Sequence, residues 1–350
     1  MKNECERFDL VSEQKVTALT PFDQNLPHGA GHNASMMRNT AIPFDAGMIE
    51  HIRVNLSAVE RRIDTLKARR SVKKKWQAAW LLKAISCIDL TTLSGDDTPG
   101  RVRRLCAKAR QPVRPDLMAA LGMADRPITV GAVCVYHEMV STAVEALKGS
   151  HIPVAAVSTG FPAGLSPFHL RLAEIHESVA AGASEIDIVI SRRHVLTSNW
   201  QALYEEVKAF REACGDAHLK AILATGELGS ATKIAKASMV AMMAGADFIK
   251  TSTGMEKINA TQPTSLIMMR AIRDYYERTG YKIGYKPAGG ISTAKDAVQY
   301  LVLVKEELGR DWLEPTLFRF GASRLLTDIE RQLEHFVTGR YSAAHRHPMG

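Results

Sequence analysis

The sequence lacks the features that define several whole classes of protein. No stretch approaches the roughly 18 consecutive apolar residues that a membrane-spanning helix needs. The first fifteen residues mix acidic and basic side chains without an apolar run, so we expect no secretory signal. Hydrophobic residues make up 46% and charged residues 23% of the 350-residue chain, and this ordinary balance excludes a mostly disordered chain and a collagen-like fibre.

Cysteine is scarce and shows no pairing pattern. The chain has five cysteines, an odd number with no CxxC pair: Cys5, Cys87, Cys106, Cys134 and Cys214. This pattern predicts free thiols in a reducing compartment rather than a disulfide scaffold. We therefore expect a cytoplasmic protein.

Charge is plentiful but unevenly placed. The formal net charge is +8, and residues 53–75 alone hold nine basic side chains and two acidic ones. A basic balance over the whole chain would favour a nucleic-acid partner, whereas one basic segment favours it only weakly. We expect no nucleic-acid partner, although segment 53–75 leaves that alternative open.

The N-terminal part of the chain differs from the rest. Residues 1–46 have no sustained apolar period and predict a loose tail. Apolar residues then recur at intervals of three or four, as on one face of a helix: Ile52, Leu56, Val59, Ile63 and Leu66. We expect this helix to pack on the main domain, and a dimer contact or an RNA- or membrane-surface element are the alternatives. Residues 1–75 are thus predicted as an N-terminal extension and 341–350 as a C-terminal tail.

From about residue 76, short apolar segments alternate with helical patterns. The predicted strands are 85–90, 128–135, 154–159, 185–190, 219–224, 247–252, 282–287 and 316–321. Helices are predicted near 98–110, 137–149, 166–181, 198–214, 229–244, 262–279, 292–307 and 322–337. Apolar strands between helices indicate a covered parallel sheet. Eight such units, without a GxGxxG after the first strand, favour an α/β fold with a (β/α)8 TIM barrel over residues 76–340.

Four ionisable residues stand in otherwise apolar strands: Asp89, Asp187, Lys250 and Lys286. Active sites of such barrels lie at the carboxyl ends of the strands, so these side chains are expected to converge. Buried lysine is rare, and a salt bridge inside the barrel is the alternative to a catalytic role. Two ammonium groups in one apolar pocket repel each other, which lowers the pKa of one of them. The neutral amine could then form a Schiff base with a carbonyl compound. The spacing does not decide which lysine is the nucleophile.

Glycine-rich loops follow the last two predicted strands. Gly289 and Gly290 precede one helix, and Gly321 with Ser323 precedes the next. Barrels often bind phosphate with these two loops, through backbone N–H groups and helix N-termini. Plain tight turns are the alternative. Together with the lysines, the loops predict a Schiff-base enzyme acting on a small phosphorylated carbonyl compound.

Seven motifs resemble, in order and spacing, those of the deoxyribose-phosphate aldolase family: IDLTTL (88–93), AVCVY (132–136), EIDIVI (185–190), LATGEL (223–228), GADFIKTSTG (245–254), KPAGGI (286–291) and RFGAS (319–323). The resemblance covers roughly residues 80–340. It implies a TIM-barrel class I aldolase without metal or organic cofactor. It also implies reversible cleavage of 2-deoxy-D-ribose 5-phosphate to D-glyceraldehyde 3-phosphate and acetaldehyde, in deoxyribonucleoside catabolism.

The resemblance assigns roles to residues of this chain. Lys250 matches the Schiff-base lysine, Lys286 the second lysine that perturbs its pKa, and Asp187 the proton-relay aspartate. Asp89 and Cys134 match residues of the pocket, although Cys134 also fits a plain core position. The remaining expected substrate and phosphate contacts are Thr253, Gly254, Gly289, Gly290, Gly321 and Ser323.

Two positions depart from the family pattern. Met255 stands where bacterial relatives often carry a lysine, and Arg324 stands where they often have a small hydroxyl residue. Arg324 could therefore supply the phosphate-binding cation. Other readings are a transaldolase-like or other sugar-phosphate aldolase, and a binding protein that keeps the barrel while its basic helix engages RNA or a protein. The sequence leaves open a homo-oligomer, and whether the segment near Tyr341 covers the site.

Overall fold

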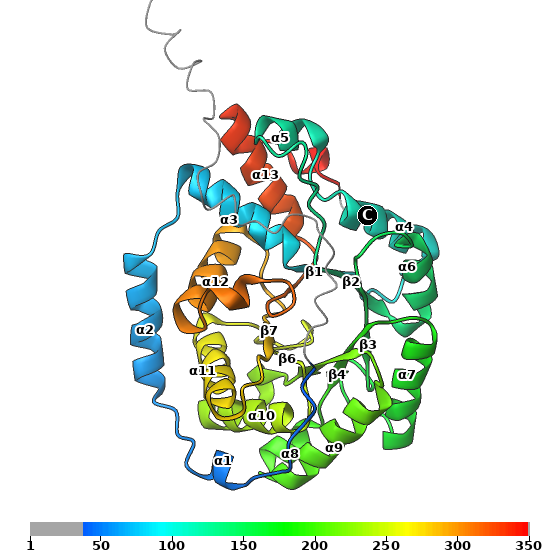
Figure 1. Ribbon diagram of the computed structural model, residues 1–350, viewed down its shortest axis with the longest axis vertical. Helices are drawn as coiled ribbons and strands as arrows, with labels where there is room; N and C mark the ends of the chain where they lie inside the picture. The colour runs from blue at the N-terminus through cyan, green and yellow to red at the C-terminus, as the bar shows by residue number, and fades with distance from the viewer. Residues whose placement is uncertain (1–37, 349–350) are drawn as a thin grey trace, which may run out of the picture.

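Eight parallel strands form the centre of the protein in the computed structural model, which describes residues 38–348 (Figure 1). The strands are β1 (Ile88–Thr91), β2 (Ala132–Tyr136), β3 (Val154–Ser158), β4 (Glu185–Val189), β5 (His218–Ile222), β6 (Phe248–Lys250), β7 (Gly284–Lys286) and β8 (Phe320–Ala322). Their order is β7-β6-β5-β4-β3-β2-β1-β8. Parallel bridges from Tyr285 to Phe318 and from Ala288 to Gly321 join β7 to the β8 segment, so the sheet closes. The predicted (β/α)8 barrel is confirmed.

Helices surround the barrel and connect successive strands (Figure 1). They are α4 (Pro99–Arg110), α5 (Pro115–Ala120), α6 (Val140–Ala146), α7 (Phe168–Ala180), α8 (Arg192–Leu196), α9 (Trp200–Ala213), α10 (Ala231–Met243), α11 (Gln262–Thr279), α12 (Ala294–Glu307) and α13 (Leu325–Thr338). Short 3₁₀ turns are η2 (His137–Met139), η3 (Thr225–Glu227), η4 (Arg310–Leu313) and η5 (Ala344–Arg346).

Helix α11 shows how local sequence sets an element. The side chain of Thr261 accepts a hydrogen bond from the Thr264 backbone N–H at the helix start, and Pro263 lies in the first turn. Both features suit a helix N-terminus, where backbone donors have no helical partner. Gly280, with φ of +77°, ends the helix in the left-handed conformation that glycine adopts without a steric penalty.

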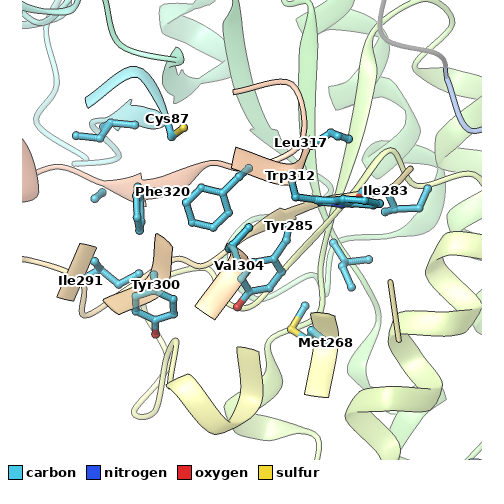
Figure 2. Close-up of a cluster of buried hydrophobic side chains, with 14 of the residues drawn as sticks. Cys87, Met268, Ile283, Tyr285, Ile291, Tyr300, Val304, Trp312, Leu317 and Phe320 are labelled. Atoms are coloured by element: carbon cyan, nitrogen blue, oxygen red, sulfur yellow. The ribbon is translucent and has the colours of Figure 1, made fainter. Parts of the chain in front are cut away.

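Between strands β7–β8 and helices α11–α12, large side chains fill the space (Figure 2). Tyr285 of β7 is fully buried and donates its hydroxyl to Ser265 Oγ of α11 at 2.6 Å. Trp312 donates its ring N–H to the Ile283 carbonyl at 2.8 Å. The ring of Phe320 packs edge-on to Tyr300. These contacts hold the closing strands of the barrel against its outer layer.

The first predicted strand begins too early. Residues 85 and 86 belong to helix α3 (Lys74–Ser86), and β1 starts at Ile88. Helix α3 packs against both α12 and α13 and is buried from Ala78 to Leu82. A short apolar run without helical amphipathicity cannot be told from a buried strand by its pattern. The last predicted strand also shortens, to Phe320–Ala322, because Phe318 forms only an isolated bridge.

The predicted N-terminal helix is present. After α1 (Gly47–Glu50), helix α2 (Leu56–Arg69) packs on α11. Its buried residues are Val59, Ile63 and Leu66, which are three of the five periodic positions. Arg62 of α2 also forms an ion pair with Glu307 at 2.9 Å. The expectation that this helix packs on the main domain is confirmed.

Residues 38–46 are not a loose tail, and this part of the prediction is wrong. The buried side chain of Asn39 donates to the Met242 and Ala246 carbonyls at 2.6 and 3.0 Å, and its backbone N–H donates to Asp247 Oδ1 at 3.0 Å. The Ile42 N–H donates to the Met243 carbonyl at 2.9 Å. An extended segment held by such bonds has no apolar period, so the pattern could not reveal it. Residues 1–37 lie outside the described part of the chain.

The C-terminal segment packs on helix α13. Tyr341 stacks on His335, and the buried His347 side chain pairs with Glu334 at 2.7 Å. These contacts place the described end of the chain on the outer helical layer. Across residues 38–348, no helix is both long and apolar enough to span a membrane.

Candidate active site

Three predicted residues meet inside the barrel. Lys250 ends β6 and lies beside Lys286 of β7 in the strand register, while Asp187 lies on β4. Lys250 Nζ is 2.8 Å and Lys286 Nζ 2.7 Å from the same oxygen, Oδ2 of Asp187. The two amines are therefore neighbours in the barrel interior, as the convergence of strand ends requires.

Asp89 of β1 also joins this group. Its Oδ2 lies 2.5 Å from Lys286 Nζ, and its Oδ1 accepts a hydrogen bond from Arg319 Nη1 at 2.5 Å. Asp89 and Asp187 thus hold the Lys286 amine between them. Asp89 contacts the lysine that is more deeply buried, and Lys250 keeps Asp187 as its ion-pair partner within residues 38–348.

The sequence interpretation missed three charged residues of the same interior. Lys220 of β5 pairs with Glu185 of β4 and lies 3.3 Å from Asp187 Oδ1. Arg319 donates to Glu185 Oε1 at 2.9 Å. Lys220 carries the same signal that revealed Lys250, a lysine in an apolar strand. Glu185 opens its strand, where a charged residue usually faces solvent.

The two neighbouring lysines have opposite pKa shifts. Burial and the positive charge of Lys286 lower the pKa of Lys250, against the opposing effect of Asp187. Asp187 and Asp89 overcome the cost of burial and raise the pKa of Lys286. Of the two, Lys250 is therefore the lysine that gives up its proton more readily, and Lys286 stays charged. Burial is the main cause of the lowered Lys250 pKa. The positive charge of Lys286, which the sequence predicted as the cause, lowers this pKa by a smaller amount.

Cys134 lies in a small apolar group inside the barrel. It is fully buried with Ala155 and Val157, and Tyr136 and Phe161 pack against them. Burial raises the pKa of its thiol. Cys134 is therefore a neutral residue of the apolar barrel interior, in line with the core alternative.

The predicted phosphate loops lie at the carboxyl ends of β6, β7 and β8. Gly254, Gly290 and Ser323 are exposed there. A side chain on Gly321 would approach within 3.2 Å of Lys286 Cε and 2.8 Å of Ala288, so glycine leaves room for the lysine. Gly289 has φ of +79°, and a Cβ there would lie 2.6 Å from Asn259.

Glu256, which the sequence interpretation overlooked, holds the loop after Lys250. Its buried carboxylate accepts hydrogen bonds from the Thr253 N–H at 3.0 Å, the Thr253 hydroxyl at 2.8 Å and the Gly254 N–H at 3.1 Å. The predicted donors Thr253 and Gly254 are thus engaged by a carboxylate of their own loop. Met255 is exposed beside them and lines a cleft that reaches Arg192.

A (β/α)8 barrel that presents a buried lysine of lowered pKa next to an aspartate and a second, charged lysine has the architecture of a class I, Schiff-base aldolase. Comparison with known proteins agrees with this class. Residues 83–324 match the model of the DeoC/LacD family of aldolases. The chain belongs to this family.

Individual relatives carry a more specific name. The chain is 60% identical to human deoxyribose-phosphate aldolase, over 89% of this chain and 98% of the human one. It is 62% identical to the mouse deoxyribose-phosphate aldolase, over 87% and 97% of the two chains. A tetrameric deoxyribose phosphate aldolase from Aeropyrum pernix superposes with a TM-score of 0.53 at 22% identity, covering 75% of this chain and 98% of that one, and it supports the shared fold.

Proposed function

We propose that this chain is a deoxyribose-phosphate aldolase. It cleaves 2-deoxy-D-ribose 5-phosphate reversibly to D-glyceraldehyde 3-phosphate and acetaldehyde, a step of deoxyribonucleoside catabolism. The observation that carries the proposal is the meeting of Lys250 and Lys286 on one oxygen of Asp187 in the buried barrel interior. Identity of 60% or more to the human and mouse enzymes supports the choice of substrate over that of other sugar-phosphate aldolases.

The reaction follows from the three side chains. Neutral Lys250 Nζ attacks the C1 aldehyde of the open-chain sugar, and loss of water gives a protonated imine. Asp187, through a bridging water, takes the proton of the C3 hydroxyl. The C2–C3 bond then breaks, and its electron pair moves toward the imine nitrogen. Glyceraldehyde 3-phosphate leaves, and an enamine of acetaldehyde remains on Lys250. Protonation of the enamine carbon and hydrolysis of the imine release acetaldehyde and restore the amine.

Lys286 and the glycine loops complete the proposed site. Lys286 remains a cation between Asp187 and Asp89 and disfavours protonation of Lys250. The N–H groups near Gly289, Gly290 and Ser323 are the proposed phosphate donors, with Arg324 as the cation that Met255 does not supply. Fixing the phosphate orients C1 toward the amine, an effect that can be worth several kcal/mol.

Borohydride trapping tests the proposal. Incubation with acetaldehyde or deoxyribose 5-phosphate and borohydride should reduce the imine and leave a covalent adduct on Lys250, located by peptide mass spectrometry. Lys250→Ala should form no adduct and lose at least about 10³-fold in kcat. An active protein with unmodified Lys250 after this treatment would refute the assignment.

We further propose a cytoplasmic homo-oligomer. The Aeropyrum pernix relative is described as tetrameric, which supports assembly of this chain. Light scattering on the purified protein measures the mass directly, and fractionation of cells measures the location. A monomer at micromolar concentration would contradict the assembly.

A further inference from the structure

Seven charged side chains fill the barrel interior within residues 38–348. The cations are Lys220, Lys250, Lys286 and Arg319, and the anions are Asp89, Asp187 and Glu185; we refer to them as the barrel charge cluster. No side chain of the cluster is more than 6% exposed. Three of its members belong to the proposed catalytic set, and Glu185, Lys220 and Arg319 are left without a role by the reaction.

Ion pairs connect the whole cluster. Arg319 spans Asp89 and Glu185, at 2.5 and 2.9 Å. Lys220 pairs with Glu185 and lies 3.4 Å from Asp89 Oδ2 and 3.3 Å from Asp187 Oδ1. A change of charge at Glu185 or Lys220 therefore alters the electrostatic potential at Asp187, which forms an ion pair with Lys250.

The cluster has one more cation than it has anions. With every lysine protonated, it carries one excess positive charge away from water, which is unfavourable. Release of one proton makes it neutral. Arginine does not deprotonate. Lys220 has three carboxylate partners, Lys286 has two and Lys250 has one, so Lys250 is the member that gives up its proton most readily.

We propose that Glu185 and Lys220, which form no ion pair with Lys250, are positioning residues that set the protonation of Lys250 through the net charge of the cluster. The other strands add little to this balance. Cys134 of β2 is a buried thiol, and the segments Val154–Ser158 of β3 and Phe320–Ala322 of β8 contain no titratable side chain. The inference rests on the proposed function only for the catalytic use of the Lys250 amine.

Two single variants should move Lys250 in opposite directions. Glu185→Gln removes one anion, so protonated Lys250 would face two excess positive charges, and its pKa should fall. Lys220→Met removes one cation, so the cluster is balanced with Lys250 protonated, and its pKa should rise. The double variant removes one charge of each sign and should return the wild-type behaviour.

The readout is the pH dependence of acetylation of Lys250 by acetic anhydride, followed by peptide mass spectrometry, because only the neutral amine reacts. Below the wild-type pKa, the Lys250 rate should be about tenfold higher in Glu185→Gln and about tenfold lower in Lys220→Met. The rising limb of the aldolase pH profile should shift in the same two directions. Circular dichroism checks the fold of each variant, and the exposed Lys257 in the same peptide digest is the internal reference.

The outcomes separate the two proposals. Unchanged acetylation profiles in both folded single variants would overturn the charge-balance inference, even if borohydride still traps Lys250. Opposite shifts without any trapped adduct would support the inference and refute the aldolase. If a single variant does not fold, the double variant is the test. A folded double variant with the wild-type acetylation profile of Lys250 supports the charge-balance inference. A shifted profile, or a double variant that does not fold, overturns it.

Discussion

The interior and the rim of the candidate site are held in different ways. In the interior, Asp187 and Lys286 are fully buried, and each is fixed by partners on other strands. At the rim, Gly254, Gly290 and Arg324 are exposed on loops. A change in the interior alters charges that water cannot replace, whereas water screens changes at the rim. Interior substitutions should therefore affect the chemical step, and rim substitutions should affect substrate affinity.

Among substitutions that keep the Lys250 amine, Asp187→Asn should have the largest effect. The amide keeps the size of the side chain but neither accepts the substrate proton nor neutralises the two lysines. We expect kcat to fall by about 10²- to 10⁴-fold, the usual contribution of a general acid–base group. Steady-state kinetics measure it, with Asp125→Asn, at an exposed position, as the matched control. A loss below threefold would show that Asp187 only holds the lysines in place.

Lys286→Leu should have an intermediate effect that depends on pH. Lys286 disfavours protonation of Lys250, and its loss also leaves Asp187 and Asp89 with one cation fewer. Both changes raise the pKa of Lys250, and the neutral amine is the reactive form. The rising limb of the pH profile should therefore move to higher pH, with about a tenfold loss of kcat/KM at pH 7 that is partly recovered at pH 9.

The position of the rising limb in the pH profile of Lys286→Leu distinguishes an electrostatic role from substrate contact. A uniform loss at every pH, with an unmoved limb, would assign Lys286 to substrate contact instead. The unchanged trapping of Lys250 at high pH would show that the nucleophile is intact in the variant.

The same contrast explains what the sequence could predict. Lys250, Lys286 and Asp187 stand out because a charge in an apolar strand is costly unless it has a partner or a task. The alternation of strands and helices predicts the barrel for a similar reason, because each strand of a parallel sheet must be covered on both faces. Such signals come from the buried interior, where few residue types are tolerated.

Other elements carry no comparable signal. Glu185 opens its predicted strand, where charge usually meets solvent. Arg319 lies within the predicted strand 316–321, and only the closed barrel shows that the two side chains face each other. Glu256 accepts hydrogen bonds from backbone N–H groups of its own loop. Any acidic residue three positions after Thr253 could make the same contact, so the sequence does not mark it. Asn39 binds backbone carbonyls more than 200 residues away in the chain, and no local pattern marks such a contact.

The smallest expected effect is at the rim, with Arg324→Ala. Arg324 is exposed and occupies the N-cap position of α13, next to Ser323, so it can reach a phosphate held by that helix start. Because an exposed ion pair contributes little, we expect KM for deoxyribose 5-phosphate to rise by about threefold to tenfold with kcat nearly unchanged. The KM for unphosphorylated 2-deoxyribose should not change. Arg340→Ala, beyond the other end of α13, is the matched control. An equal rise of KM for both sugars would show that Arg324 contacts the sugar chain rather than the phosphate. If KM rises for neither sugar, the phosphate is bound by backbone N–H groups without Arg324.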